Sequence, residues 1–175
     1  MGAMSIRSPV LTLIISCCAS LAQADELTLR KFLLFDKIPD AQDHVRLVAS
    51  PYTLHFSPSE RHKPVWMIGA EKQYADGDVL GAAYFSNSFG QDSLTVYRGE
   101  QIRNWSRFEK LYFQWTAGLM YGYKGEFQDE VPLNFKGFSP VVVVSLGWQF
   151  TPKYSVQVNL LGFAAAMVQV SMRLP

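Results

Sequence analysis

The chain has few cysteines, almost no net charge and, past its N-terminal segment, no long apolar run. Cys17 and Cys18 are the only cysteines among 175 residues, and the formal net charge is +1. A near-neutral chain has no strong electrostatic attraction to nucleic acid, and no group of Cys or His residues has the spacing of a metal site. No segment after residue 24 reaches the roughly 18 apolar residues of a membrane-spanning helix. The length fits one domain.

The N-terminal segment has the three parts of a secretory signal peptide. Arg7 supplies a basic start, the apolar stretch PVLTLIISCCASL follows, and the sequence AQA ending at Ala24 is a small-x-small cleavage site. We therefore predict a signal peptide over residues 1–24. The stretch IISC also resembles a lipoprotein box, which would place cleavage at Cys17 instead. Under the secretory interpretation both cysteines are removed, and the exported chain has no disulfide.

Apolar residues, by contrast, are plentiful. Hydrophobic residues make up 49% of the chain and aromatic residues 14%. An exported domain without disulfides must be stabilised by a large core or by its solvent. A transmembrane β-barrel accounts for this composition, because its strands are about ten residues long and need to be apolar on one face only.

Apolar and polar residues alternate with period two along most of the chain, as in half-buried strands. The clearest cases are SVQVNL at residues 155–160 and the segment 165–174. We predict eight strands, at residues 46–56, 64–74, 79–88, 93–105, 110–123, 139–150, 154–162 and 165–174. The fold class expected for residues 45–175 is thus an all-β, eight-stranded antiparallel transmembrane barrel, whose interior is filled by side chains or holds one small ligand.

One segment before the strands has a helical pattern. DELTLRKFLLFDKI, residues 25–38, predicts a short amphipathic helix that ends at Pro39. We assign residues 25–44 to a periplasmic amphipathic helix, either packed on a core or lying at the membrane interface.

The stretch VVVVSL, residues 141–146, is apolar in both phases. Part of the barrel interior is therefore expected to be apolar. The lumen of a porin is polar, whereas a barrel that binds a hydrocarbon chain requires an apolar interior. A lipocalin, a soluble barrel with an apolar inside and a polar outside, is the alternative. The wholly polar second phase of the last two strands favours lipid outside.

Two predicted strand ends carry side chains that could perform chemistry together. His55 ends the first predicted strand, and Ser88 ends the third. Alternate strands of an antiparallel barrel run in the same direction, so both residues are expected at one rim. A histidine there could take a proton from an attacking hydroxyl, as in acyl transfer. His44 and His62 fall in polar segments and are expected to be solvated.

Four short stretches, YTLHF, RHKPVW, GAAYFSNSF and WTAGL, resemble in order and spacing the outer-membrane lipid A palmitoyltransferases (PagP). Members of that family are eight-stranded barrels preceded by an amphipathic helix. They move a palmitoyl chain from a glycerophospholipid to lipid A and hold the chain in an apolar interior well. The resemblance covers most of the chain after the signal peptide, although each motif is short.

The resemblance implies specific site residues. The family's catalytic His matches His55, and its Asp-Ser pair falls on Asn87-Ser88. Asn87 is a departure, because an amide cannot carry the charge that stabilises an imidazolium, and Asp92 could supply a carboxylate if the loop folds back. The floor of the family's well falls on Gly99. The alternative is that Gly99 is a strand glycine that eases strand curvature.

The family also interrupts strand pairing with prolines, which let lipid enter from the side. Pro51, Pro64 and Pro140 lie near predicted strand ends here, where each removes a backbone donor.

The function expected from these features is that of a monomeric lipid A palmitoyltransferase in the outer membrane of a Gram-negative bacterium. Its partners would be a glycerophospholipid acyl donor, a lipid A acceptor and the surrounding lipid, and no cofactor, metal or nucleic acid is implied. A lipid A deacylase is one alternative, because SNSFG loosely resembles a motif of that barrel family with Tyr84 in place of its His. A small barrel without enzymatic activity is the other.

Overall fold

The computed structural model describes residues 42–57, 59–103, 106 and 108–175. The predicted signal peptide at 1–24 and the predicted helix at 25–38 lie outside the described residues. Within the described ranges, no helix is long and apolar enough to cross a membrane.

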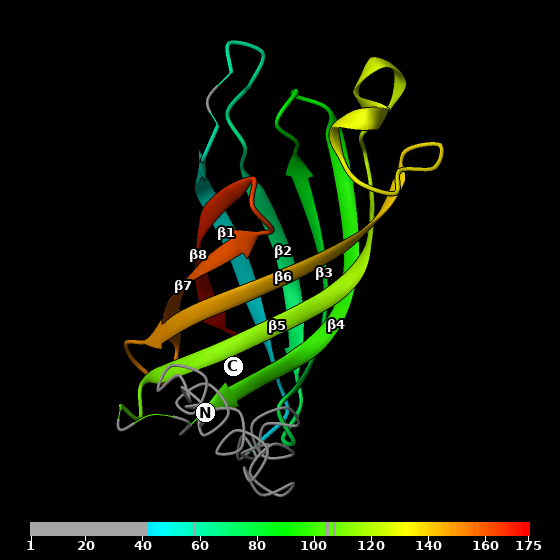
Figure 1. Ribbon diagram of the computed structural model, residues 1–175. Coiled ribbons are helices and arrows are strands. Elements are labelled where there is room, and N and C mark those ends of the chain that lie inside the picture. The colour runs from blue at the N-terminus through cyan, green and yellow to red at the C-terminus, as the bar shows by residue number, and fades with distance from the viewer. Residues whose placement is uncertain (1–41, 58, 104–105, 107) are drawn as a thin grey trace, which may run out of the picture. The chain divides into compact units, whose positions relative to one another are not determined.

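Eight antiparallel strands close into a barrel in sequence order, each paired with its neighbours and β1 paired with β8 (Figure 1). The strands are β1 His44–His55, β2 Met67–Gln73, β3 Asp78–Ser86, β4 Asp92–Arg103, β5 Leu111–Tyr121, β6 Phe138–Gln149, β7 Tyr154–Leu161 and β8 Ala165–Arg173. All eight predicted strands are confirmed, with ends that differ by a few residues. The largest difference is at β2, which begins at Met67 and not at Pro64, since proline has no N–H for the ladder.

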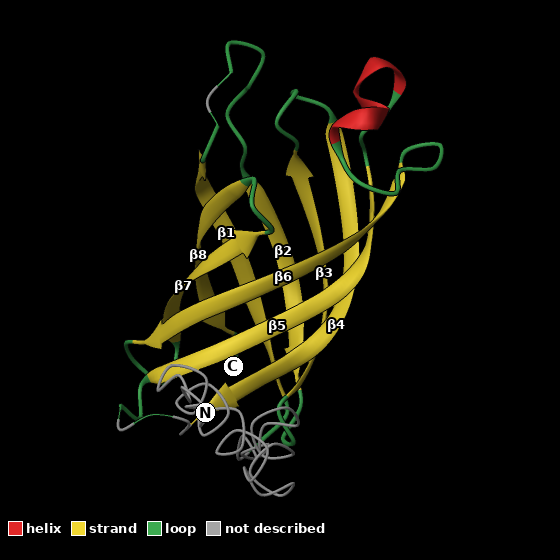
Figure 2. Ribbon diagram, viewed as in Figure 1, coloured by secondary structure: helices red, strands yellow, loops and turns green. Residues whose placement is uncertain are grey.

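The two ends of the barrel differ in their connections. The segments β1–β2, β3–β4, β5–β6 and β7–β8 meet at one end, here called the loop end, and the β5–β6 segment there contains the short 3-10 helix η1, Gly125–Glu130 (Figure 2). The other end, the turn end, carries the remaining connections and the end of β8.

The outer face of the barrel is apolar and the inner face is largely polar. Large apolar side chains that are 44–61% exposed include Leu47, Leu54, Ile68, Leu80, Leu94, Val96, Val142 and Leu146. Buried polar side chains include Ser50, Glu71, Gln114, Ser145, Gln157, Asn159, Gln169 and Ser171. A lipocalin would have the reverse arrangement, so the surface agrees with lipid outside.

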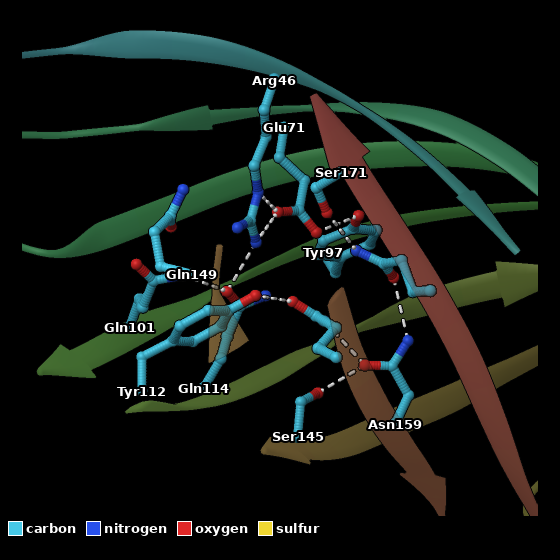
Figure 3. A network of polar contacts seen from close by, with 12 residues as sticks. Arg46, Glu71, Tyr97, Gln101, Tyr112, Gln114, Ser145, Gln149, Asn159 and Ser171 are labelled. Atoms are coloured by element: carbon cyan, nitrogen blue, oxygen red, sulfur yellow. Dashed lines mark hydrogen bonds and ion pairs between the residues drawn. The ribbon is translucent and has the colours of Figure 1, made fainter. Parts of the chain in front are cut away.

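A hydrogen-bonded polar network lies inside the barrel (Figure 3). Arg46 forms an ion pair with Glu71 and donates to Gln114 Oε1 at 2.7 Å, and Tyr97 donates to Glu71 Oε1 at 2.8 Å. A second group continues it, in which Asn159 accepts from Ser145 and Gln157 and donates to Gln169. Strands from all around the barrel thus contribute to one closed plug.

Gly99 lies on the inner face of β4, beside Thr116 of β5. A Cβ at this position would collide with the backbone of β5, at the carbonyl of Trp115 and at Cα of Thr116. Glycine is therefore needed here because the two backbones approach closely. This close approach is a structural reason for a glycine at position 99 that does not involve a bound acyl chain.

Gly99→Met is accordingly expected to destabilise the barrel rather than to shorten a bound chain. Overpacking costs about 1–3 kcal/mol in well-packed sites, and here the obstacle is backbone that cannot rotate away. Unfolding by urea in phospholipid vesicles measures the loss. Ala82→Met, on the exposed outer face, is the control and should unfold at the wild-type urea concentration.

Candidate active site

His55 and Ser88 meet at the loop end of the barrel. His55 Nε2 lies 2.8 Å from Ser88 Oγ, and both side chains are half-buried. β1 and β3 run in the same direction with β2 between them, which brings the two strand ends to one rim. The sequence predicted that these residues would lie together, and the structure brings them into hydrogen-bond contact.

The direction of the His55 side chain depends on an irregularity in β1. Pairing with β8 shifts between Ala49 and Tyr52, so β1 contains an extra residue there. Such a bulge reverses which residues face inward on its two sides. Ser50 faces inward before the bulge, and His55 faces inward after it. Strict alternation would have turned His55 toward lipid.

Asn87 is fully buried and shapes the turn that presents Ser88. Its Oδ1 accepts hydrogen bonds from the backbone N–H groups of Phe89 and Gln91, both at 3.0 Å. Its Nδ2 donates to Gln91 Oε1 at 3.2 Å and to the carbonyl of Gly122 at 3.4 Å. Three of these bonds lie within the β3–β4 turn, and the fourth ties the turn to the segment after β5. None of the four goes to the imidazole of His55.

Asp92 does not supply the carboxylate that the sequence analysis considered. Its Oδ1 accepts a hydrogen bond from the Tyr84 hydroxyl at 2.6 Å, and this contact is exposed at the start of β4. Within the described residues, no carboxylate makes a hydrogen bond or an ion pair with His55. The loop does not fold back, because the Asn87 turn fixes its path.

The prediction that His62 is solvated is wrong. Its ring lies against that of His55, with ring centroids 4.3 Å apart and planes tilted by 30°. His62 Nδ1 is buried without a hydrogen-bond partner in the described structure. The polar stretch SERHKP gave no sign of this, because the contact depends on how the β1–β2 segment folds over the rim.

Tyr123, which follows β5, contributes a hydroxyl beside Ser88. Burial raises the pKa of the Tyr123 phenol, and hydrogen bonds from the side chain and backbone of Ser88 act in the opposite direction. The net upward direction keeps the phenol neutral at physiological pH. Sequence reasoning missed Tyr123 because it was counted only as the last residue of the predicted strand at 110–123.

A cavity of about 340 Å³ runs from this rim into the barrel. Apolar side chains line it below His55 and Ser88: Val65, Met67, Phe85, Met120, Val143 and Met167. The polar network forms its floor: Glu71, Tyr97, Gln114, Gln157, Asn159 and Gln169. Gly99 is not among the lining residues and lies two residues nearer to the turn end than Tyr97. The expectation of a partly apolar interior around VVVVSL is met, since Val141 and Val143 both face the cavity.

Strand pairing is incomplete beside the cavity at two places. β1 and β2 pair only as far as Ser50 and Met67, and β6 and β7 only as far as Val144 and Leu160. Toward the loop end, each pair of strands therefore separates. Pro51 and Pro64 lie in the first gap and Pro140 in the second, where they have no N–H to offer a ladder.

The site has no metal-binding character. Within the described ranges, no group of three or more His, Cys, Asp or Glu side chains could hold an ion. The chemical groups at the rim are two imidazoles, a hydroxyl and a phenol above an apolar cavity, a set that suits proton transfer to and from an oxygen nucleophile.

Comparisons with known proteins address the fold. No family model and no curated protein matches the chain. Among solved structures, a de novo designed transmembrane β-barrel is similar, with 13% identity and a TM-score of 0.51 over 78% of this chain and 99% of that one. The chain shares the fold of that barrel, a closed eight-stranded antiparallel β-barrel. The outer membrane protein Ail of Yersinia pestis, solved in a phospholipid bilayer nanodisc, has 10% identity to the barrel and a TM-score of 0.47 over 75% of this chain and 99% of that one.

Proposed function

We propose that this barrel is an acyltransferase of the Gram-negative outer membrane, which moves a palmitoyl chain from a glycerophospholipid to lipid A. The observation that carries the proposal is the His55–Ser88 hydrogen bond of 2.8 Å at the mouth of an apolar cavity. The resemblance of four short stretches to the lipid A palmitoyltransferases (PagP) gives the same reaction. Lipid A is the acceptor proposed because it is an abundant hydroxyl-bearing lipid of that membrane.

In this proposal His55 acts as a general base. It takes the proton of an attacking hydroxyl, either that of Ser88 or that of an acceptor bound beside it. A bond forms between the attacking oxygen and the carbonyl carbon of the donor ester, and the bond from that carbon to the glycerol oxygen breaks. The proton held by His55 passes to the departing glycerol oxygen, which leaves as a lysophospholipid. Where Ser88 is the attacking group, a lipid A hydroxyl then attacks the acyl-serine carbonyl, His55 takes that proton and returns it to the Ser88 oxygen as the acyl–Ser88 bond breaks.

The cavity and the two gaps supply the lipid path. An acyl chain that enters between separated strands does not have to leave the apolar phase, because the cavity wall below His55 is itself apolar. The ester would lie at the rim, beside Ser88, and the chain would point toward the polar floor. Each methylene that fills the apolar part contributes about 0.8 kcal/mol of burial.

The test is the mass spectrum of lipid A from cells that express the protein and from cells that do not. A gain of one acyl chain in the expressing cells supports the transferase. Loss of a chain would indicate a lipid A deacylase, in which water replaces the acceptor hydroxyl at the same pair of residues. Unchanged lipid A in cells whose outer membrane contains the folded barrel would contradict both activities and leave a barrel without enzymatic function.

Chain length should respond to a substitution just above the floor. Thr116 is 7% exposed, lines the cavity and lies one inward position above Gln114. Thr116→Leu is expected to shift transfer toward shorter chains, with selectivity of roughly fourfold for each methylene excluded. Mixed-length phospholipid donors and mass spectrometry of the product measure the shift.

Thr116→Val is the matched control, because it keeps the side-chain volume and removes only the hydroxyl. Its chain-length profile should match that of the wild type. A Thr116→Leu profile that also matches the wild type would mean that bound chains do not reach the polar floor.

A further inference from the structure

His55 lacks the support that a catalytic histidine ordinarily receives. A base is usually oriented by a third group, commonly a carboxylate, on the far side of its ring. Here Asn87 is occupied by the turn and Asp92 by Tyr84. Among the described residues, the His55 ring forms a hydrogen bond with Ser88 and lies against the ring of His62.

The segment that carries His62 is attached to the catalytic pair itself. The backbone N–H of Lys63 donates to the carbonyl of Ser88 at 2.8 Å, and the N–H of His62 donates to the carbonyl of Ser59 at 3.0 Å. His62 is therefore part of a tight turn fixed to the residue that hydrogen-bonds His55. A shift of His62 would have to break the bond between Lys63 and Ser88.

Aromatic contacts hold the His62 ring from the other side. Phe89 meets it edge-on, with centroids 5.8 Å apart, and Phe89 is itself stacked on Phe127 at 4.3 Å. Arg61 lies over both phenyl rings and forms an ion pair with Glu130 at 3.2 Å. Three loops thus converge on one imidazole that has no hydrogen-bond partner at Nδ1.

We propose that His62 is a positioning residue, which fixes the ring plane of His55 by stacking and so keeps Nε2 directed at Ser88. The hydrogen bond to Ser88 restrains one ring atom, and rotation about that contact remains until a second surface blocks it. The face of His62 is that surface. The proposal assigns no role to the buried Nδ1, which has no hydrogen-bond partner in the described structure. The proposal rests on the function proposed above, since it assigns His62 to the same site.

Two substitutions separate the ring from its nitrogens. His62→Ala removes the stacking surface, and a misplaced base is expected to lower kcat about 10- to 100-fold with little change in KM. His62→Phe keeps a planar ring against His55 and should retain kcat within about threefold of the wild type. His44→Ala, at the turn end, is the control and should leave both constants unchanged.

The assay uses the complete processed chain in detergent micelles, with phospholipid donor and lipid A acceptor. If His62 acts through the pair, His62→Ala should cause no further loss in a Ser88→Ala background. The proposal is overturned by wild-type kcat in His62→Ala, by a rise in KM alone, or by His62→Phe being as impaired as His62→Ala. The last result would mean that a ring nitrogen is needed.

A second measurement does not depend on activity. In protein labelled with 15N-histidine, the His55 Nε2 signal should show its hydrogen bond in the wild type and in His62→Phe, and should lose it in His62→Ala. If the wild type transfers no acyl chain, the proposed function fails, yet this spectrum still decides whether His62 positions His55. An unchanged Nε2 signal in His62→Ala overturns the inference.

Discussion

His55→Ala and Ser88→Ala should each lower acyl transfer by about 10²- to 10⁴-fold while leaving the barrel folded. Without the His55 imidazole the attacking hydroxyl loses the base that is hydrogen-bonded beside it, and general-base catalysis is worth about 10²- to 10⁴-fold. Without the Ser88 hydroxyl, the imidazole loses its 2.8 Å partner. Both residues lie at the loop end, and neither is part of the polar network that fills the interior. Transfer to lipid A, followed by mass spectrometry, measures the loss.

The two substitutions should also be non-additive. When two residues act as one catalytic unit, the first substitution already removes most of the rate enhancement that the unit provides. The rate of acyl transfer by His55→Ala/Ser88→Ala should therefore be about the same as that of either single variant. Heat-modifiable migration on gels checks that each variant is folded. Additive losses would assign the two residues to separate steps, and full activity in either single variant would remove that residue from the mechanism.

Much of the fold could be predicted because lipid imposes a simple rule on each strand. A side chain that faces a bilayer must be apolar, so period-two alternation is visible in the sequence wherever a strand crosses. The same rule marks the bulge in β1. Before Pro51 the outward apolar residue is the odd-numbered Leu47, and after it the outward apolar residues are the even-numbered Tyr52 and Leu54. This change of phase indicates the extra residue and the inward direction of His55.

Strand direction predicted that His55 and Ser88 lie at the same rim, and the contact between them depends in addition on the bulge in β1. The position of His62 was not predictable, because it lies in an irregular segment whose path is set by distant contacts such as Lys63 N–H with the Ser88 carbonyl. The residues that form the cavity floor could not be predicted from the sequence either. Gly99 matched a short motif by position, but the floor is set by how far the long side chains of Glu71 and Tyr97 extend across the lumen.

Glu71→Ala is expected to be the most destabilising single substitution in the interior. Glu71 is 2% exposed, pairs with Arg46 and accepts a hydrogen bond from Tyr97. Removing the carboxylate leaves the Arg46 guanidinium buried without its counter-charge, and loss of one partner of a buried pair typically costs about 3–5 kcal/mol. Urea unfolding in phospholipid vesicles, followed by tryptophan fluorescence, measures the change.

The loss of stability in Glu71→Ala is expected to come from the unpaired Arg46 charge and not from the loss of a favourable ion-pair energy. A combined variant distinguishes these two causes. Arg46→Met/Glu71→Leu/Tyr97→Phe replaces both charged side chains and the tyrosine that donates to Glu71 by apolar side chains of similar size. Such replacements are often neutral or stabilising, so this barrel should recover most of the stability lost in Glu71→Ala. The cavity floor becomes apolar at Glu71 and Tyr97 in this variant, and transfer of longer acyl chains should increase relative to the wild type. If Glu71→Ala unfolds at the wild-type urea concentration, water already hydrates Arg46, and the network is not the dry plug that its burial indicates.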